Sequence, residues 1–212
     1  AHRQLAVRVA DLAAAKAACD NGADTIYIGG EAFKPQRPWT LADIQTAIKI
    51  AETTNTKVVV LTPRTTMRRE CGELEQFFAE LMKIRPAGIM VSNLGSLNLA
   101  RTLTDLPLQA DFAFNTFNHL STQFLKKNGI RQTVASLEAS YPQVRDLIEA
   151  SALPIEISVH GATEAMICDH NFAAMQLDFS PLQNPELADH HYALLDTAKE
   201  AHPLRVDQYE RT

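Results

Sequence analysis

The sequence has no long hydrophobic run, few cysteines and no excess of positive charge. No stretch of eighteen apolar residues occurs in its 212 residues, and no signal-peptide pattern is present. The three cysteines, Cys19, Cys71 and Cys168, lie far apart and form no CxxC pair, which argues against a disulfide scaffold or a self-contained zinc site. We therefore expect a cytoplasmic protein in a reducing compartment, with no membrane partner.

Lysine and arginine are scattered along the chain, and the formal net charge is -5. The electrostatic field of such a charge distribution gives no support to a nucleic-acid-binding surface, although a local basic cleft is not excluded. Hydrophobic residues make up 46% and charged residues 21%, which is the composition of a soluble globular protein. The length is sufficient for one well-buried domain.

Several familiar motifs are also missing. Neither GxGxxG nor a GxxxxGKS/T phosphate loop follows any apolar run, which weakens a nucleotide-binding open sheet. Neither HExxH nor GxSxG occurs, so the sequence contains no zinc-protease or serine-hydrolase motif and no assembled nucleophile–base pair.

The sequence does contain one repeated unit: a short apolar run, a turn, an amphipathic helix, then a glycine or proline. The apolar runs predict strands at residues 5–9, 25–30, 57–63, 87–93, 107–111, 131–137 and 155–159. Helices are predicted between them, with Asp11 and Thr40 as N-caps and Gly129 as a stop. Seven consecutive units require right-handed parallel crossovers, which both a barrel and an open doubly wound sheet accommodate.

We favour an α/β TIM-like (β/α)8 barrel that forms a single domain over residues 1–212, with its active face at the C-terminal ends of the strands. The chain stops at Thr212 where an eighth unit should proceed, so we expect an incomplete barrel cut from a longer chain. Residues 171–212 break the repeat and predict an irregular excursion; periodicity alone allows a helix over residues 185–201.

The central candidate for chemistry is His160, which follows the alternating run Ile155, Ile157, Val159 and precedes Gly161. This pattern predicts a buried strand that ends at a turn, where α/β folds place catalytic groups. Glu138, at the end of the preceding strand, is expected to pair with His160 for acid/base catalysis. The alternatives are a histidine that only closes the core and a glutamate that caps a helix or pairs with an arginine.

Other polar residues at the predicted strand ends and in the loops are candidates for substrate binding. They are Glu31, Arg37, Arg64, Asn93, Asp111, Asn115, Asn118 and Arg205. Arg37 or Arg64 would hold an anionic group. Asn115 and Asn118 have a second interpretation as turn residues at the start of the fifth helix.

Cys168 is a candidate thiol because His160 and His170 lie near it in the sequence, but a structural role is the alternative. Glu164, Asp169 and His170 would form a metal site with His160, yet no recognised ligand spacing is present, so no metal is assigned. The two histidines at positions 190 and 191 are expected to face solvent in a loop.

Several blocks of the sequence resemble, in order, those of the collagenase-like peptidase family, peptidase family U32. They are residues 21–33, 115–118, 129, 136–138 and 159–161. Residues 192–196 through 203–207 are similar to the hairpin that follows the family's cysteine-rich segment, and this favours strands there over a helix.

The resemblance implies a TIM-like barrel, a peptidase (hydrolase) activity and, in several members, an iron–sulfur cluster that serves hydroxylation of RNA or of a quinone precursor. Cluster-bearing members carry four cysteines after the His-Gly step, whereas this sequence has only Cys168 there. No cofactor is therefore expected within this chain. The hypotheses are a protease acting on a peptide, a hydroxylase relative acting on RNA or a small molecule, and a non-catalytic binding barrel.

Overall fold

The computed structural model describes residues 3–34, 36–164, 166–170 and 192–212. The chain divides into two compact units. The first comprises Ala1–Gly30 and Trp39–Gly161, and the second comprises Glu31–Pro38 and Ala162–Thr212. The single-domain expectation for residues 1–212 stays a prediction. No helix in the described part of the chain is long and apolar enough to cross a membrane.

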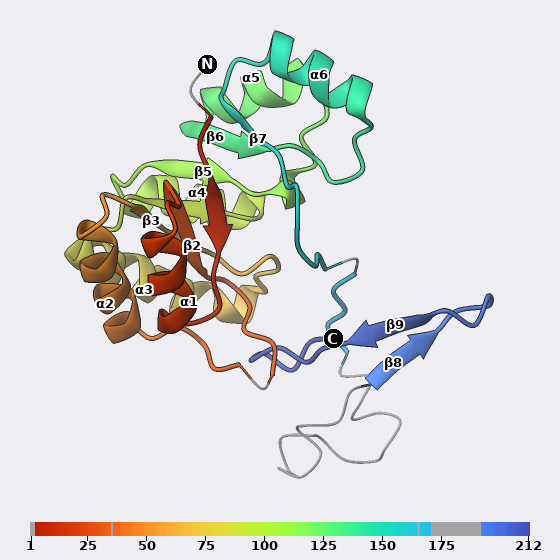
Figure 1. Ribbon diagram of the computed structural model, residues 1–212, viewed down its shortest axis with the longest axis horizontal. Helices are drawn as coiled ribbons and strands as arrows, with labels where there is room; N and C mark the ends of the chain where they lie inside the picture. Colours follow the sequence, from red (N-terminus) through yellow and green to blue (C-terminus); the bar gives the residue numbers. More distant parts are fainter. Residues whose placement is uncertain (1–2, 35, 165, 171–191) are drawn as a thin grey trace. The chain divides into compact units, whose positions relative to one another are not determined.

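The first unit contains a sheet of seven parallel strands whose spatial order follows the chain order (Figure 1). The strands are β1 (Ala6–Arg8), β2 (Thr25–Gly29), β3 (Lys57–Leu61), β4 (Gly88–Val91), β5 (Leu108–Ala110), β6 (Ile130–Val134) and β7 (Ile155–Glu156). Within the described residues β7 does not pair with β1, so the sheet forms a half-barrel. The predicted TIM-like barrel, incomplete at its C-terminal side, is confirmed.

A helix follows each of the first six strands. The α-helices are α1 (Leu12–Asp20), α2 (Leu41–Glu52), α3 (Cys71–Ile84), α4 (Leu94–Leu103), α5 (His119–Lys127) and α6 (Tyr141–Ala150), and short 3-10 turns occur at η1 (Arg68–Glu70) and η2 (Phe112–Phe114). Local chemistry sets their starts. Asp11 accepts a hydrogen bond from the Ala14 amide at 2.8 Å, and Thr40 forms a capping box with Asp43.

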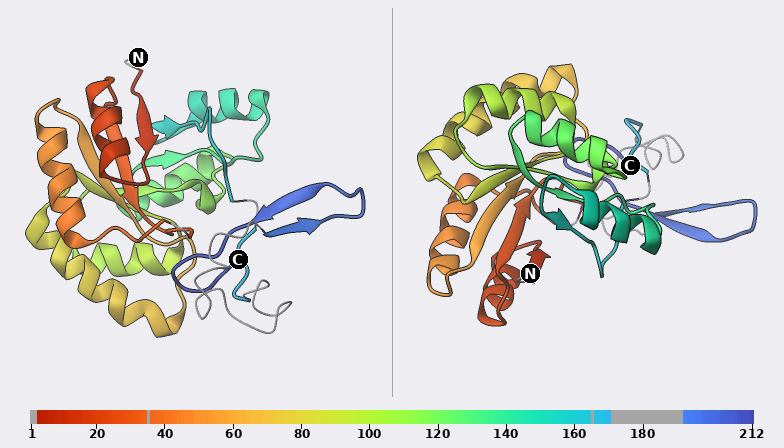
Figure 2. Two further views of the ribbon diagram at one scale, coloured as in Figure 1. Left: turned by 60° about the horizontal axis from the view of Figure 1, so that its bottom comes forward. Right: turned by 90° about the horizontal axis from the view of Figure 1, so that it is seen from above.

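The two faces of the sheet differ in composition because side chains alternate along each strand. Ile26 and Ile28 of β2 point outward into a large apolar core shared with the helices, which lie along that side of the sheet (Figure 2). The residue between them, Tyr27, belongs to a smaller inner cluster with Val59, Leu61, Met90 and Val134. The apolar cluster on the inner face is the smaller of the two, so polar side chains can lie on this face of the half-barrel.

The strand expected over residues 155–159 is shorter than predicted. Pairing with β6 ends at the Val134–Glu156 register, and β7 has no neighbour on its other side among the described residues. Without partners the chain leaves the sheet, so Ile157 and Val159 are 43% and 85% exposed. The predicted burial of this segment is wrong.

The second unit contains an antiparallel hairpin of β8 (Tyr192–Leu195) and β9 (Ala201–Leu204). This confirms the predicted terminal hairpin over the helix that periodicity allowed. Elsewhere in this unit the loop after β2 pairs with the chain end: the Lys34 amide donates to the Val206 carbonyl at 2.9 Å, and Phe33 and Asp207 form an antiparallel bridge. The rest of the expected excursion, residues 171–191, lies outside the described residues.

Candidate functional site

The C-terminal ends of β3, β4 and β5 are joined by a buried polar group. The Ser92 hydroxyl has two acceptors within reach of its one hydrogen, the Thr62 carbonyl at 3.3 Å and Asp111 Oδ2 at 3.2 Å, and the Ser92 amide donates to Thr62 Oγ1 at 3.2 Å. Thr62 and Ser92 are almost fully buried. Asp111 also accepts from the Phe112 amide at 2.6 Å, so its carboxylate caps η2 as well as facing the strand ends.

Asn115 and Glu138 lie one strand further along the sheet. Asn115 has a positive φ of 49° and closes η2, which is the turn role that the sequence left open. Its Oδ1 accepts from the Ser136 hydroxyl at 3.4 Å, and the Glu138 amide donates to that hydroxyl at 3.3 Å. Ser136 thus brings these two predicted residues to the same strand end.

Asn93 and Asn118 are helix N-caps. Asn93 Oδ1 accepts from the Ser96 amide at 2.8 Å at the start of α4, and Asn118 Oδ1 accepts from the Ser121 amide at 3.0 Å at the start of α5. Asn93 Nδ2 also donates to the Arg64 carbonyl at 3.3 Å, and the Arg64 guanidinium lies 5.1 Å from the centre of the Phe112 ring. Their substrate-binding roles stay predictions.

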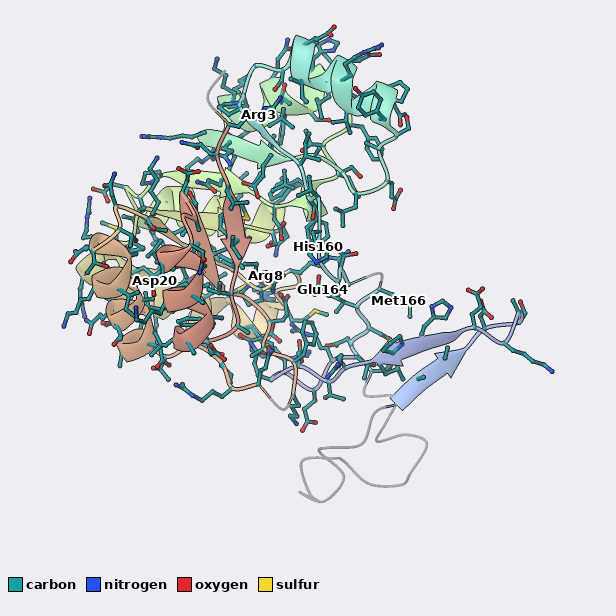
Figure 3. The ribbon with its side chains drawn as sticks, in the orientation of Figure 1. Arg3, Arg8, Asp20, His160, Glu164 and Met166 are labelled. Atoms are coloured by element: carbon teal, nitrogen blue, oxygen red, sulfur yellow. The ribbon has the colours of Figure 1, made fainter. Side chains whose placement is uncertain are left out.

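His160 lies on the extended segment that follows β7 (Figure 3). The next residue, Gly161, has φ of 129°, a conformation that only glycine adopts easily. His160 and Glu138 are both exposed, and among the described residues no hydrogen bond or ion pair joins them. The structure therefore does not bring the predicted acid/base pair into contact, and the catalytic roles remain predictions.

Four predicted residues belong to the second unit: Glu31, Arg37, Cys168 and Arg205. Arg37 and Arg205 are exposed, and Glu31 is half-buried. Cys168 is a half-buried free thiol whose backbone pairs with Thr212, with N–O distances of 2.6 and 3.1 Å.

The residues of this chain do not fit an all-cysteine iron–sulfur cluster. Cys19 is buried in α1, Cys71 opens α3, and Cys168 lies in the second unit; these three are the chain's only cysteines. They cannot supply four thiolates. The metal site considered around His160 is not assembled either: among the described residues, the one group with suitably close ligand atoms is the exposed set Asp196, Glu200 and His202.

The sequence analysis missed a polar cluster on the inner face of the half-barrel. The Tyr27 hydroxyl lies 2.5 Å from Glu156 Oε2 and 3.2 Å from Gln109 Oε1, and Gln132 Nε2 donates to Glu156 Oε2 at 2.8 Å. We call Tyr27, Gln109, Gln132 and Glu156 the inner-face quartet. It joins four strands, of which β2 is not a sheet neighbour of β5, β6 or β7.

Burial shifts the titration of both ionisable members of the quartet. Burial, and then the charges of Glu156 and Asp111, raise the pKa of the Tyr27 phenol far above its usual range. Burial also raises the pKa of Glu156, against the opposing effect of its hydrogen bonds with Tyr27 and Gln132. Ionisable groups with shifted pKa values that contact one another occur at functional sites as well as in structural networks.

One signal in the sequence was available for this cluster. Gln109 stands between Leu108 and Ala110, and Glu156 follows Ile155, so each interrupts an apolar run at an inner-face position. A polar residue at such a position either finds a partner or faces a ligand. The partners, however, come from distant parts of the chain.

A separate groove lies beside the start of α4, η2 and α5. Its volume is about 570 Å³, and apolar side chains dominate its lining, including Leu94, Phe114, Leu120 and Phe124. Among the predicted site residues, Asn93 also lines this groove. The inner-face quartet is not part of it.

Among known protein families, the model of peptidase family U32 matches residues 10–171 of this chain. The chain belongs to peptidase family U32. This confirms the resemblance found in the sequence, and the match covers the half-barrel from β2 to β7 together with part of the second unit.

Curated relatives of this U32 chain have different names. It is 26% identical over 175 residues to the uncharacterized protease MJ0090 of Methanocaldococcus jannaschii, covering 79% of this chain and 42% of the relative. It is 24% identical over 151 residues to the tRNA hydroxylation protein P1 of Bacillus subtilis, covering 69% and 36%. It is 26% identical over 154 residues to the 23S rRNA 5-hydroxycytidine C2501 synthase of Escherichia coli, covering 72% and 23%. The chain spans less than half the length of each.

Solved structures support the fold. The U32 peptidase Mk0906 matches with a TM-score of 0.63 and 12% identity, covering 99% of this chain and 89% of that one. Thiamine phosphate pyrophosphorylase from Pyrococcus furiosus matches with a TM-score of 0.53 and 10% identity, covering 76% of each chain. At these identities the likeness concerns the fold alone.

Proposed function

We propose that this U32 chain is the substrate-binding barrel of an RNA-hydroxylating enzyme. The observation that carries the proposal is the inner-face quartet, in which two amides, a phenol and a carboxyl group meet on one face of the half-barrel. Polar groups that converge on the inner side of a barrel fix the orientation of a ligand. The names of two relatives, which mention tRNA hydroxylation and 5-hydroxycytidine, suggest the RNA base as that ligand.

The chain's own residues supply binding and orientation. Gln109 and Gln132 offer amide donors and acceptors, and Tyr27 and Glu156 hold them in place across the half-barrel. The three cysteines do not supply the four thiolates of a cluster, so we assign substrate binding, and not electron transfer, to this domain.

A peptidase is the second candidate, because one relative is named as an uncharacterized protease. Nucleophilic hydrolysis needs a hydroxyl or thiol beside a base. The hydroxyl groups at the strand ends have other partners: Ser92 bonds to Thr62 and Asp111, and Ser136 bonds to Asn115. The geometry of these residues favours the binding role over a serine peptidase.

The decisive experiment compares modified nucleosides in a host with and without the gene. Mass spectrometry of digested ribosomal and transfer RNA should show loss of a hydroxylated nucleoside in the deletion strain. The wild-type gene should restore it, Gln132→Ala should restore it poorly, and Gln45→Ala, on the exposed side of α2, should restore it fully. An unchanged nucleoside profile, together with cleavage of a fluorescent peptide library by the purified protein, would favour the peptidase.

A further inference from the structure

The inner-face quartet forms one continuous chain of hydrogen-bonding groups. It runs from Gln132 on β6 to Glu156 on β7, then to Tyr27 on β2 and to Gln109 on β5, with contacts of 2.8, 2.5 and 3.2 Å. The Tyr27 residue is 5% exposed, and the other three are half-buried. Because buried polar groups are hydrogen-bonded, each contact between two neighbouring groups in this chain needs one hydrogen, which one group donates and the other accepts.

Counting hydrogens favours one charge state of the chain when Gln109 is placed as in the structure, with its Oε1 toward Tyr27. A phenol carries one hydrogen, but Tyr27 faces two acceptor atoms, Glu156 Oε2 and Gln109 Oε1. If Glu156 is ionised, it takes the phenol hydrogen and the contact with Gln109 contains none. If Glu156 is protonated, its hydroxyl donates to Tyr27, Tyr27 donates to Gln109, and every contact contains one hydrogen. The protonated form satisfies all three contacts as they stand.

Burial is the largest effect of the surroundings on Glu156 and raises its pKa, against the hydrogen bonds with Tyr27 and Gln132, which lower it. The titratable groups that affect it are Tyr27 from β2 and Asp111 from the end of β5, and the negative charge of Asp111 raises its pKa further after the effect of burial. On β1, Arg8 extends toward Gly30, where its Nη2 lies 3.3 Å from the position that a Cβ would occupy. The inner-face neighbours from β3, β4 and β6 are apolar: Val59, Leu61, Met90 and Val134.

Three polar atoms of the quartet are left for a ligand. Gln109 Nε2, Gln132 Oε1 and Glu156 Oε1 make no hydrogen bond within the described residues, and none of them is among the buried atoms without a partner. They amount to one donor and two acceptors on a neutral surface. The edge of a planar amide or imide group presents the complementary donors and acceptors.

We infer that the inner-face quartet is a binding site for an uncharged, planar ligand with an amide or imide edge, and that it binds this ligand only while Glu156 carries its proton. The inference rests on the proposed function and deepens it, because a pyrimidine base belongs to this ligand class. The nearby Asp111 and the acceptor atoms of the site disfavour an anionic ligand. Loss of the proton places a second negative charge there and removes one hydrogen bond from the chain.

The test is calorimetric titration of the full chain with uracil, over a pH series from weakly acidic to weakly alkaline. Orotate, the same ring with a carboxylate, is the matched charged probe. We expect uracil affinity to fall by about tenfold as Glu156 ionises, which is the effect of one lost hydrogen bond, and orotate to bind at least about tenfold more weakly throughout. In Glu156→Gln, which has no proton to lose, uracil affinity should not change with pH.

Infrared spectroscopy tests the charge state without a ligand. A protonated-carboxyl C=O band should be present in the wild-type protein, disappear at higher pH, and be missing from Glu156→Gln. Equal affinity for orotate and uracil, pH-independent uracil affinity in the folded wild-type protein, or absence of the band would each overturn the inference. If uracil fails to bind while the deletion strain loses a hydroxylated nucleoside, the inference fails and the proposed function stands. If uracil binds as expected while the deletion strain keeps all its hydroxylated nucleosides, the inference stands and the proposed function fails.

Discussion

At the scale of single residues, Tyr27 is the side chain that connects distant parts of the half-barrel. Its hydroxyl contacts Gln109 and Glu156, which lie 82 and 129 residues away in the sequence. Its ring packs in the inner apolar cluster, so one residue contributes both burial and hydrogen bonding.

Tyr27→Phe should lower the free energy of unfolding by about 1–3 kcal/mol, because it keeps the ring but leaves Glu156 and Gln109 without their common partner. Chemical denaturation measures the change. Tyr141→Phe is the control, since Tyr141 is 81% exposed, and it should alter stability by less than about 0.5 kcal/mol. Equal effects of the two substitutions would show that the Tyr27 hydroxyl contributes nothing to the fold.

Glu156→Gln should change how stability depends on pH. Burial raises the pKa of Glu156 in the folded protein above its unfolded value, so the folded state binds the proton more tightly. The wild-type protein therefore loses stability as pH rises from the unfolded pKa through the folded pKa, by at most about 1.4 kcal/mol per pH unit from this group. The variant should show a flatter profile and higher relative stability above that window. Parallel profiles of unfolding free energy against pH would contradict the shift.

At the scale of secondary-structure elements, close contact between β4 and β5 depends on a residue without a side chain. A Cβ on Gly88, the first residue of β4, would lie 2.8 Å from the Pro107 carbonyl oxygen just before β5. By contrast, Gly72 lies in the first turn of α3, and a Cβ there would meet nothing within 4 Å.

Gly88→Ala should therefore destabilise the protein by about 1–3 kcal/mol, because the backbone of one strand has to shift. Gly72→Ala is its matched control and should stabilise the protein by up to about 1 kcal/mol, since alanine is the better helix former. Thermal unfolding of both variants tests the pair. A neutral Gly88→Ala would mean that β4 and β5 are less closely packed than the structure has them.

At the scale of the whole molecule, the charge of the chain limits how it can meet RNA. Its formal net charge is -5, so no general attraction to the phosphate backbone is expected. Recognition of a base by the inner-face quartet involves neutral groups and does not depend on phosphate contacts.

A single-stranded RNA oligonucleotide should therefore bind this chain weakly, with an affinity that changes little as salt is added, because few phosphates are neutralised and few counterions are released. Uracil affinity should stay within about twofold over the same salt range, because neutral hydrogen bonds are little screened. Fluorescence anisotropy measures the affinity for the oligonucleotide, and calorimetry measures the affinity for uracil. Tight RNA binding that weakens steeply as salt is added would point to a basic recognition surface elsewhere on the chain.

Much of the fold was predictable because its signals are local. Short apolar runs marked all seven strands, and caps such as Asp11 and Thr40 marked helix starts with residues a few positions apart. The sequence did not separate two roles at Asn93 and Asn118: their position at strand ends predicts substrate binding, which stays a prediction, and their side chains cap α4 and α5 in the structure. A cap and a ligand-binding asparagine look alike in sequence.

The amino-acid sequence by itself determined the order of the strands and helices, because periodicity and caps act over short stretches of chain. The family and the terminal hairpin were predicted from the resemblance of sequence blocks, since periodicity alone allowed a helix over residues 185–201. Only the tertiary structure decided the end of β7 at Glu156, since the length of a strand depends on its neighbours. It also decided the inner-face quartet. Tyr27, Gln109, Gln132 and Glu156 meet because the parallel strands curve toward one another, and no local pattern encodes a contact between residues that far apart in the chain.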